Sequence, residues 1–398
     1  MSAPRPVSLP PALAAILETL EAHGARAHVV GRGALALWRN QPSPGYAVLT
    51  TASSEALLPL FPTAVAGVGA RHWRLTTPVG PVDLRPTPPE RSLAAQLAEQ
   101  DFRCHAIALD ARGQLEDPWQ GVADATAGCL ASPEDPAVSL TRDPLRALRA
   151  VRLVATEGWA LAPDLEAALP DAVGALSKAP AAPLRAELGA LLQGEHVAAG
   201  LSLLRRAGIE GALAPGVRDD AAAVVAALPP DPTLRLAAWL RGTRVVRILR
   251  RLRVARERVV AIERLLQLHP IDALAPPDAE GRWRRLWRRS GELVPGLLAL
   301  REAELAAEGR ADRPDFRAIR DVLDRVANEP EEAPILALDG RAVMDLLGCG
   351  PGPEVGDAMR RLRAVVAADP TKNDPETLRR LLLDERDTER TNGRNPDE

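Results

Sequence analysis

One segment of the sequence combines an aspartate with three regularly spaced arginines. Asp143 is followed by Arg146, Arg149 and Arg152, and the apolar residues between them have helical spacing. A carboxylate that accepts hydrogen bonds beside guanidinium groups that donate them can recognise the edge of a base, while neighbouring arginines contact phosphate. An amphipathic helix with a solvated arginine face would give the same pattern. The segment alone leaves a nucleotide-binding helix and a structural helix both open.

Two further groups of arginines lie in later segments with helical periodicity. The first belongs to a stretch that predicts a single helix over residues 244–268. The second surrounds Trp283 and Trp287, which we expect to anchor their helix in the core because they lie four residues apart. Arginines on such helices can bind an RNA backbone through its phosphates, or can simply be solvated. The RNA-binding candidates are Arg247, Arg251, Arg284 and Arg288.

Acidic residues, histidines and cysteines give weaker signals. Asp83, in the strand-like run GPVDLRP, is a candidate catalytic carboxylate, although a lone acid on a strand is more often structural. The six histidines do not pair at metal-ligand spacing, and we expect His105 to pack in the sheet. The three cysteines lie far apart, which argues against a disulfide framework and fits a cytoplasmic protein.

The secondary structure that positions these candidates can be predicted from the spacing of apolar residues, and this spacing changes near residue 143. Before that point strand-like runs alternate with helical stretches, and after it only helical patterns follow one another. The strand-like runs cover residues 27–31, 46–51, 72–77, 82–85 and 104–109. The predicted fold class is therefore α+β, with a mixed α/β head followed by an all-helical neck, body and tail.

The composition excludes several classes of protein. The 398 residues carry a formal net charge of −3, so the chain is not basic throughout and any affinity for nucleic acid must come from local patches. Aromatic residues make up 3%, which disfavours a platform of stacked aromatics for bases. No apolar run reaches the roughly 18 residues of a membrane span, so we expect no membrane partner.

Several segments together resemble one family of RNA-processing enzymes. DFRCHA (from Asp101), LEDPWQGVADATAGCL (from Leu115) and RDPLRALRAVR (from Arg142) are similar, in this order, to motifs of the class II tRNA nucleotidyltransferase and poly(A) polymerase family. LDGRAVMDLLGCGPGPEVG, near the end of the chain, resembles the tail element of that family. Bacterial members build or repair the CCA end of tRNA. The resemblance implies a nucleotidyltransferase fold in which the Asp143 helix binds the nucleotide.

The resemblance also implies an order of domains. Residues 1–140 correspond to the nucleotidyltransferase head and residues 141–215 to a neck with the nucleotide-reading and RNA-binding helices. Residues 216–383 correspond to a helical body and tail, and the charged, polar residues 384–398 are predicted to form a disordered tail. The implied partner is tRNA or another structured RNA, with ATP and CTP as further candidate ligands.

The match fails at the catalytic core. Active members carry Gly-Gly-x-x-Arg-Asp after the first strand and Asp-x-Asp on the next, whereas this chain has VGRGALALW and GYAVLTT. By register, Arg32 replaces the second glycine, Gly45 and Ala47 replace the two metal-binding aspartates, and Asp83 matches the third carboxylate. One carboxylate offers too few ligands for the Mg²⁺ that activates the RNA hydroxyl and neutralises the triphosphate. We therefore expect no intact metal site and no cofactor, with Mg²⁺ and ATP or CTP needed only if the protein is active.

Three functions follow from these observations, and whether the protein is an enzyme stays open between them. The first is a non-catalytic relative that binds tRNA through its arginines and the remaining nucleotide pocket. The second is an active nucleotidyltransferase that adds CMP or AMP to tRNA 3′ ends. The third is a helical scaffold that binds another protein. The missing Asp-x-Asp favours the first.

Overall fold

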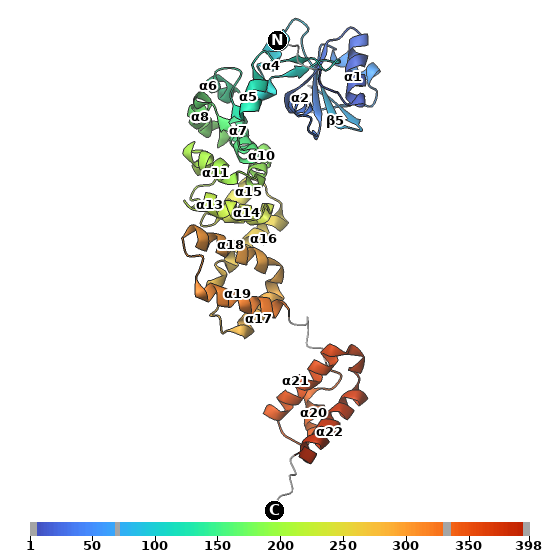
Figure 1. The fold of residues 1–398 in the computed structure, drawn as a ribbon, viewed down its shortest axis with the longest axis vertical. Helices are drawn as coiled ribbons and strands as arrows, with labels where there is room; N and C mark the ends of the chain where they lie inside the picture. Colours follow the sequence, from blue (N-terminus) through green and yellow to red (C-terminus); the bar gives the residue numbers. More distant parts are fainter. Residues whose placement is uncertain (1–5, 68–71, 329–335, 393–398) are drawn as a thin grey trace, which may run out of the picture. The chain divides into compact units, whose positions relative to one another are not determined.

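The computed structural model of the chain describes residues 6–67, 72–328 and 336–392 (Figure 1). These residues form two compact units. The first contains residues up to 274 together with 292–314, and the second contains residues 275–291 and those from 315 onward. The division falls inside the segment 216–383 that the sequence predicts as one body and tail.

The N-terminal part of the first unit is built on a mixed β-sheet. In the described part of the chain this sheet has seven strands in the order β3-β4-β5-β2-β1-β6-β7, and only β2 and β5 run parallel to each other. The strands are β1 (Ala27–Val30), β2 (Tyr46–Thr50), β3 (Val65–Ala66), β4 (Trp73–Thr77), β5 (Gly80–Pro86), β6 (Ala108–Leu109) and β7 (Leu115–Glu116). The prediction of a strand over 104–109 is correct only for its last two residues, because a 3₁₀ turn, η2 (Arg103–His105), precedes β6.

Short helices accompany this sheet. They are α1 (Pro11–Ala22), α2 (Gly31–Trp38), α3 (Ser54–Leu60), α4 (Leu93–Leu97) and α5 (Gly121–Ala127). Helix α2 begins directly after β1, at Gly31 with φ +73°, a conformation that favours glycine. A Cβ atom at Gly33 would lie 2.9 Å from the Tyr46 ring, so this second glycine lets α2 pack closely against β2.

The rest of the first unit is helical apart from two short paired strands, which confirms the predicted α+β class. Its longer helices are α6 (Pro136–Arg142), α7 (Leu145–Glu157), α10 (Ala181–Gln193), α11 (Val197–Arg206), α14 (Pro232–Leu240), α15 (Val245–Arg251), α16 (Arg256–Leu268) and α18 (Val294–Ala307). Its shorter elements are β8 (Cys129–Leu130), β9 (Ala160–Leu161), α8 (Pro163–Ala168), η3 (Leu169–Ala172), α9 (Val173–Leu176), α12 (Ile209–Leu213), α13 (Ala221–Ala226) and η4 (Ile271–Ala273). Helix α7 packs against both α10 and α11 through its buried apolar residues, including Leu148 and Val151. This packing fixes the helix that carries the candidate arginines.

The predicted single helix over 244–268 is wrong. Helix α15 ends at Arg251 and α16 begins at Arg256, because Arg253 has a left-handed backbone with φ 51°. The guanidinium group of Arg185, on α10, donates hydrogen bonds to the carbonyl oxygens of Leu252 and Arg253, which stabilises the break. The apolar periodicity of the sequence continues through residues 252–255 and therefore does not indicate the break between the two helices.

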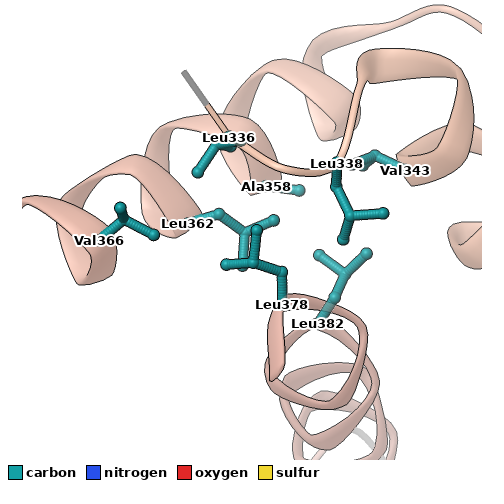
Figure 2. Close-up of a cluster of buried hydrophobic side chains, with 8 residues drawn as sticks. All are labelled: Leu336, Leu338, Val343, Ala358, Leu362, Val366, Leu378 and Leu382. Carbon is teal, nitrogen blue, oxygen red and sulfur yellow. The ribbon is translucent and has the colours of Figure 1, made fainter. Parts of the chain in front are cut away.

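The second unit consists of helices. They are α17 (Glu280–Ser290), α19 (Pro314–Ala327), α20 (Gly340–Leu347), α21 (Pro353–Ala368) and α22 (Pro375–Asn392), with 3₁₀ turns η5 (Gly291–Leu293) and η6 (Pro370–Lys372). Trp283 is buried, as expected, and its indole N–H donates to the carbonyl oxygen of Pro276. Helices α20, α21 and α22 share a small apolar core, and Figure 2 shows their side chains pointing toward one another. Its members are Leu336, Leu338, Val343, Ala358, Leu362, Val366, Leu378 and Leu382.

The C-terminal segment differs from its prediction. The sequence predicts disorder from residue 384, but α22 continues to Asn392, so the prediction is wrong for residues 384–392. The segment is rich in Glu and Arg, which favour helix almost as much as leucine does, and a helix that has already begun extends more easily than it nucleates. Residues 393–398 lie outside the described residues. Within the described ranges, no helix is long and apolar enough to cross a membrane.

Candidate functional site

A cavity of about 760 Å³ lies in the first unit, over the part of the sheet where β2 and β5 run parallel. Strands β2 and β5 supply its floor, and the first turn of α2 lies beside them. Helix α7 contributes Arg149 and Arg152, and α10 contributes Glu187. The cavity therefore brings together the residues that the sequence assigns to catalysis and part of those that it assigns to nucleotide binding.

The register of the strands determines which residues face this cavity. Ala47 of β2 pairs with Asp83 of β5, and Gly45 precedes Ala47 by two residues on the same face. Val82 and Leu84, on either side of Asp83, are fully buried on the opposite face. The floor thus has one carboxylate, at Asp83, beside two positions that have no side-chain ligand.

The carboxylate of Asp83 is bound by an arginine from the neighbouring strand. Arg74 of β4 is its antiparallel partner, and Arg74 Nε and Nη2 donate to Asp83 Oδ1 and Oδ2 at 2.7 and 3.0 Å. This bidentate hydrogen bond is the main reason that the pKa of Asp83 lies below its usual value, although burial opposes the shift. The carboxylate is therefore ionised, and each of its oxygens accepts one hydrogen bond from Arg74.

The space next to Gly45 is too small for a side chain. A Cβ atom at this position would lie 2.8 Å from the carbonyl oxygen of Pro81 and 3.0 Å from its ring, at the start of β5. Real Cβ contacts below 3.0 Å are almost never found. An aspartate at residue 45 would therefore require a movement of the β5 backbone.

The other acidic residues of the cavity are also ion-paired with arginines. Glu99 pairs with Arg91 at 2.8 Å, Asp101 with Arg149 at 3.0 Å, and Glu187 Oε2 with Arg152 Nε at 2.6 Å. In the described part of the chain, no group of three or more His, Cys, Asp and Glu side chains is arranged to hold a metal ion. The carboxylates of this cavity therefore neutralise neighbouring arginines, and among the described residues they do not gather around a common metal position.

The four predicted nucleotide-binding residues separate into two pairs. Arg149 and Arg152 line the cavity, whereas Asp143 and Arg146 do not. Asp143 accepts a hydrogen bond from Arg149 Nη1 at 2.8 Å and so positions that arginine. The side chain of Arg146 is only 6% exposed, and it donates to Asp101, Glu134, Ser139 and the carbonyl oxygen of Glu99. Arg146 therefore joins α7 to the loop before η2 and to α6.

Two exposed arginines at this cavity were not predicted as binding residues from the sequence. Arg32 and Arg85 are both exposed and both line it, although the sequence marks neither as a binding residue. The alternation of apolar and polar residues in Val82-Asp83-Leu84-Arg85 is the sequence signal that could have placed Arg85 on the same face as Asp83. His105 is buried as expected, but at the wall of the cavity and not within a strand. Burial, reinforced by the charges of Arg32, Arg152 and Arg39, lowers the pKa of His105 to about 3.

The four predicted RNA-binding arginines also have different surroundings. Arg247 and Arg288 are exposed. Arg251 donates to the carbonyl oxygens of Ala212 and Ser177, so it links α15 to two neighbouring segments. Arg284 forms an ion pair with Glu280, four residues earlier on α17, at 2.9 Å. Arg247 and Arg288 are therefore the better candidates for contacts to phosphate.

The chain is similar to enzymes that add nucleotides to tRNA. It is 30% identical over 350 residues to the A-adding tRNA nucleotidyltransferase of Deinococcus radiodurans. The aligned region covers 73% of this chain and 79% of that relative. It is 26% identical over 408 residues to the CCA-adding enzyme of Geobacillus stearothermophilus, with 95% and 97% of the two chains covered. The crystal structure of the Bacillus stearothermophilus CCA-adding enzyme in complex with CTP has the same fold, with a TM-score of 0.67, 23% sequence identity, and coverage of 96% of this chain and 100% of that one. No protein-family model matches the chain. The identity to the Deinococcus radiodurans enzyme over most of both chains, together with the shared fold, shows that the chain belongs to the tRNA nucleotidyltransferase family that includes the A-adding and CCA-adding enzymes.

Proposed function

We propose that this protein binds the 3′ region of tRNA and does not catalyse metal-dependent nucleotidyl transfer. The observation that carries the proposal is the set of three neighbours across the sheet, Arg74, Asp83 and Ala47. Asp83 has an arginine on one side and a methyl group on the other. Magnesium needs several oxygen ligands around one point, and nucleotidyl transfer needs that ion to activate the attacking hydroxyl. The donor set around Asp83 does not suit such an ion.

The binding half of the proposal rests on family membership and on the cationic side chains. The relatives add nucleotides to tRNA, and this chain aligns with one of them over nearly its whole length. Arg149 and Arg152 remain at the cavity, and Arg247 and Arg288 are exposed on the helical part of the chain. Arginine contacts to phosphate provide affinity that does not depend on base sequence.

Two assays test the halves of the proposal separately. For catalysis, the purified chain is incubated with tRNA lacking its 3′ end, labelled ATP or CTP, and Mg²⁺ or Mn²⁺, beside an active CCA-adding enzyme. We expect no incorporation. Incorporation that disappears in Asp83→Ala would show that the protein is an active nucleotidyltransferase and would overturn this half.

For binding, the affinity for tRNA is measured between about 50 and 200 mM salt, where phosphate contacts lose strength. We expect saturable binding that weakens steeply with salt. No binding at the lowest salt, or an affinity independent of salt, would overturn the RNA-binding half and favour a helical scaffold that binds protein.

A further inference from the structure

Two of the arginines that face the cavity, Arg32 and Arg85, differ from the others in their contacts. Among the residues that the structure describes, neither Arg32 nor Arg85 forms a side-chain hydrogen bond or an ion pair, although both line the cavity. The other arginines that line it are ion-paired with its carboxylates. Five arginines and four carboxylates line the described cavity in all. The fourth carboxylate, Asp83, pairs with Arg74, which does not line the cavity, so Arg32 and Arg85 have no carboxylate partner among the described residues.

The positions of these two arginines are set by the sheet and by α2. Arg85 follows Asp83 by two residues on the same face of β5, and it pairs in register with Leu49 of β2. Arg32 lies in the first turn of α2, beside the same floor. Burial is the main cause of the lowered pKa of His105 in the wall of the cavity, and the charges of Arg32 and Arg152 lower it further.

We propose that this cavity binds the phosphates of a nucleoside triphosphate without a divalent cation, through the guanidinium groups of Arg32 and Arg85. The proposal rests on the proposed function, since it concerns a cavity that does not hold the catalytic metal. A guanidinium group presents a planar set of N–H donors that matches two phosphate oxygens, and it carries the positive charge that a metal ion would otherwise supply. The volume of about 760 Å³ lies within the range of small-molecule sites.

Binding of this kind reverses the usual effect of magnesium. A triphosphate chelated by Mg²⁺ carries less negative charge, and its oxygens are partly occupied by the ion. Two arginines attract the metal-free triphosphate more strongly than the chelate. Excess Mg²⁺ should therefore weaken binding here, whereas a site that holds the metal would require it.

Isothermal titration calorimetry of the full chain tests this reversal. ATP, CTP and inorganic tripolyphosphate are titrated in EDTA and in excess Mg²⁺, at one ionic strength so that screening is constant. We expect saturable binding in EDTA and at least about fivefold weaker binding in Mg²⁺. Arg32→Gln and Arg85→Gln should each weaken binding about tenfold, the loss expected for one charge-assisted contact.

Arg112→Gln is the matched control, because Arg112 is an exposed head arginine that does not line the cavity. It should leave binding unchanged, and circular dichroism should show that all three variants are folded. Binding that requires Mg²⁺, or that survives both cavity substitutions, would overturn the proposal. If tripolyphosphate and nucleotides fail to bind while both substitutions weaken tRNA binding, RNA phosphate is the ligand and the nucleotide proposal is overturned.

The two proposals fail in different assays. Incorporation of nucleotide into tRNA would contradict the proposed function. Absence of both incorporation and metal-free binding would contradict only the role of Arg32 and Arg85.

Discussion

The guanidinium group of Arg74 and the carboxylate of Asp83 are paired edge to edge across two antiparallel strands, with N–O distances of 2.7 and 3.0 Å. Asp83 is paired in register with Arg74 of β4 on one side and with Ala47 of β2 on the other. Asp83 is therefore a partner in a side-chain contact within the sheet as well as a residue of the cavity floor.

The two residues that replace the expected aspartates should respond differently to substitution. Gly45→Asp forces a Cβ atom against Pro81, so we expect a loss of about 1–3 kcal/mol in the free energy of unfolding. Ala47→Asp puts its carboxylate at the half-buried cavity floor and should cost less. Urea denaturation of both variants measures the difference. Equal losses would contradict the close contact at Gly45.

The neutral, buried His105 should make stability depend on pH. The unfolded histidine takes up a proton near its ordinary pKa of 6.5, whereas burial lowers the pKa of the folded one to about 3. The contribution of neutral His105 to the free energy of unfolding is therefore fully present above pH 6.5. It falls by about 1.4 kcal/mol per pH unit as the pH is lowered from 6.5 toward 3. His105→Asn should remove this slope in urea unfolding curves recorded from about pH 6.5 to 5, where most carboxylates stay ionised.

His23→Asn is the control for that experiment, because His23 is exposed and its ring contacts the carbonyl oxygen of Thr19, one turn earlier on α1. This variant should keep the slope of the unsubstituted protein. A slope that persists in His105→Asn would assign the pH dependence to another group.

Arg146 should matter for folding more than for ligand binding. Arg146→Met removes the positive charge from a side chain that is 6% exposed and leaves Asp101 and Glu134 with fewer partners, so we expect a loss of about 3 kcal/mol. Arg142→Met is matched, since Arg142 also pairs with Glu134 but is 48% exposed, and it should cost less than about 1 kcal/mol. Thermal and urea unfolding measure both. A stable Arg146→Met variant that fails to bind nucleotide would contradict this expectation and support the base-reading role predicted from the sequence.

Exposed arginines on the helical part of the chain should control the salt dependence of tRNA binding. Arg247→Gln and Arg288→Gln should each lower the slope of log affinity against log salt by about 1, because each would remove one phosphate contact. Arg251→Gln should also reduce stability, since Arg251 holds the carbonyl oxygens of Ala212 and Ser177. Fluorescence anisotropy at several salt concentrations measures the slopes. Unchanged slopes in the first two variants would exclude those residues from the interface.

The sequence predicts most of the sheet and the identity of the cavity floor. Strands β1, β2, β4 and β5 follow from short apolar runs between turn residues, and the family resemblance assigns Ala47 and Asp83 to related positions. Their pairing in the structure agrees with that assignment. Local patterns suffice for the strands because β-branched and apolar alternation determines both the strand and its buried face, whereas the residues of the cavity floor follow from the family resemblance.

The charge network of the cavity could not be predicted in the same way. Arginines three residues apart on a helix rotate by about 60° at each step, so Arg146 and Arg152 cannot share one face. Which of them becomes buried depends on Asp101 and Glu134, which lie far away in the sequence. The break at Arg253 likewise depends on a tertiary contact, from Arg185.

The close approach of Pro81 to Gly45 has a practical consequence for redesign. Aspartates introduced at residues 45 and 47 would not by themselves form a pair of metal ligands, because Pro81 occupies the space that a side chain at residue 45 needs. A redesign that adds carboxylates to this floor would therefore have to begin with the backbone at the start of β5.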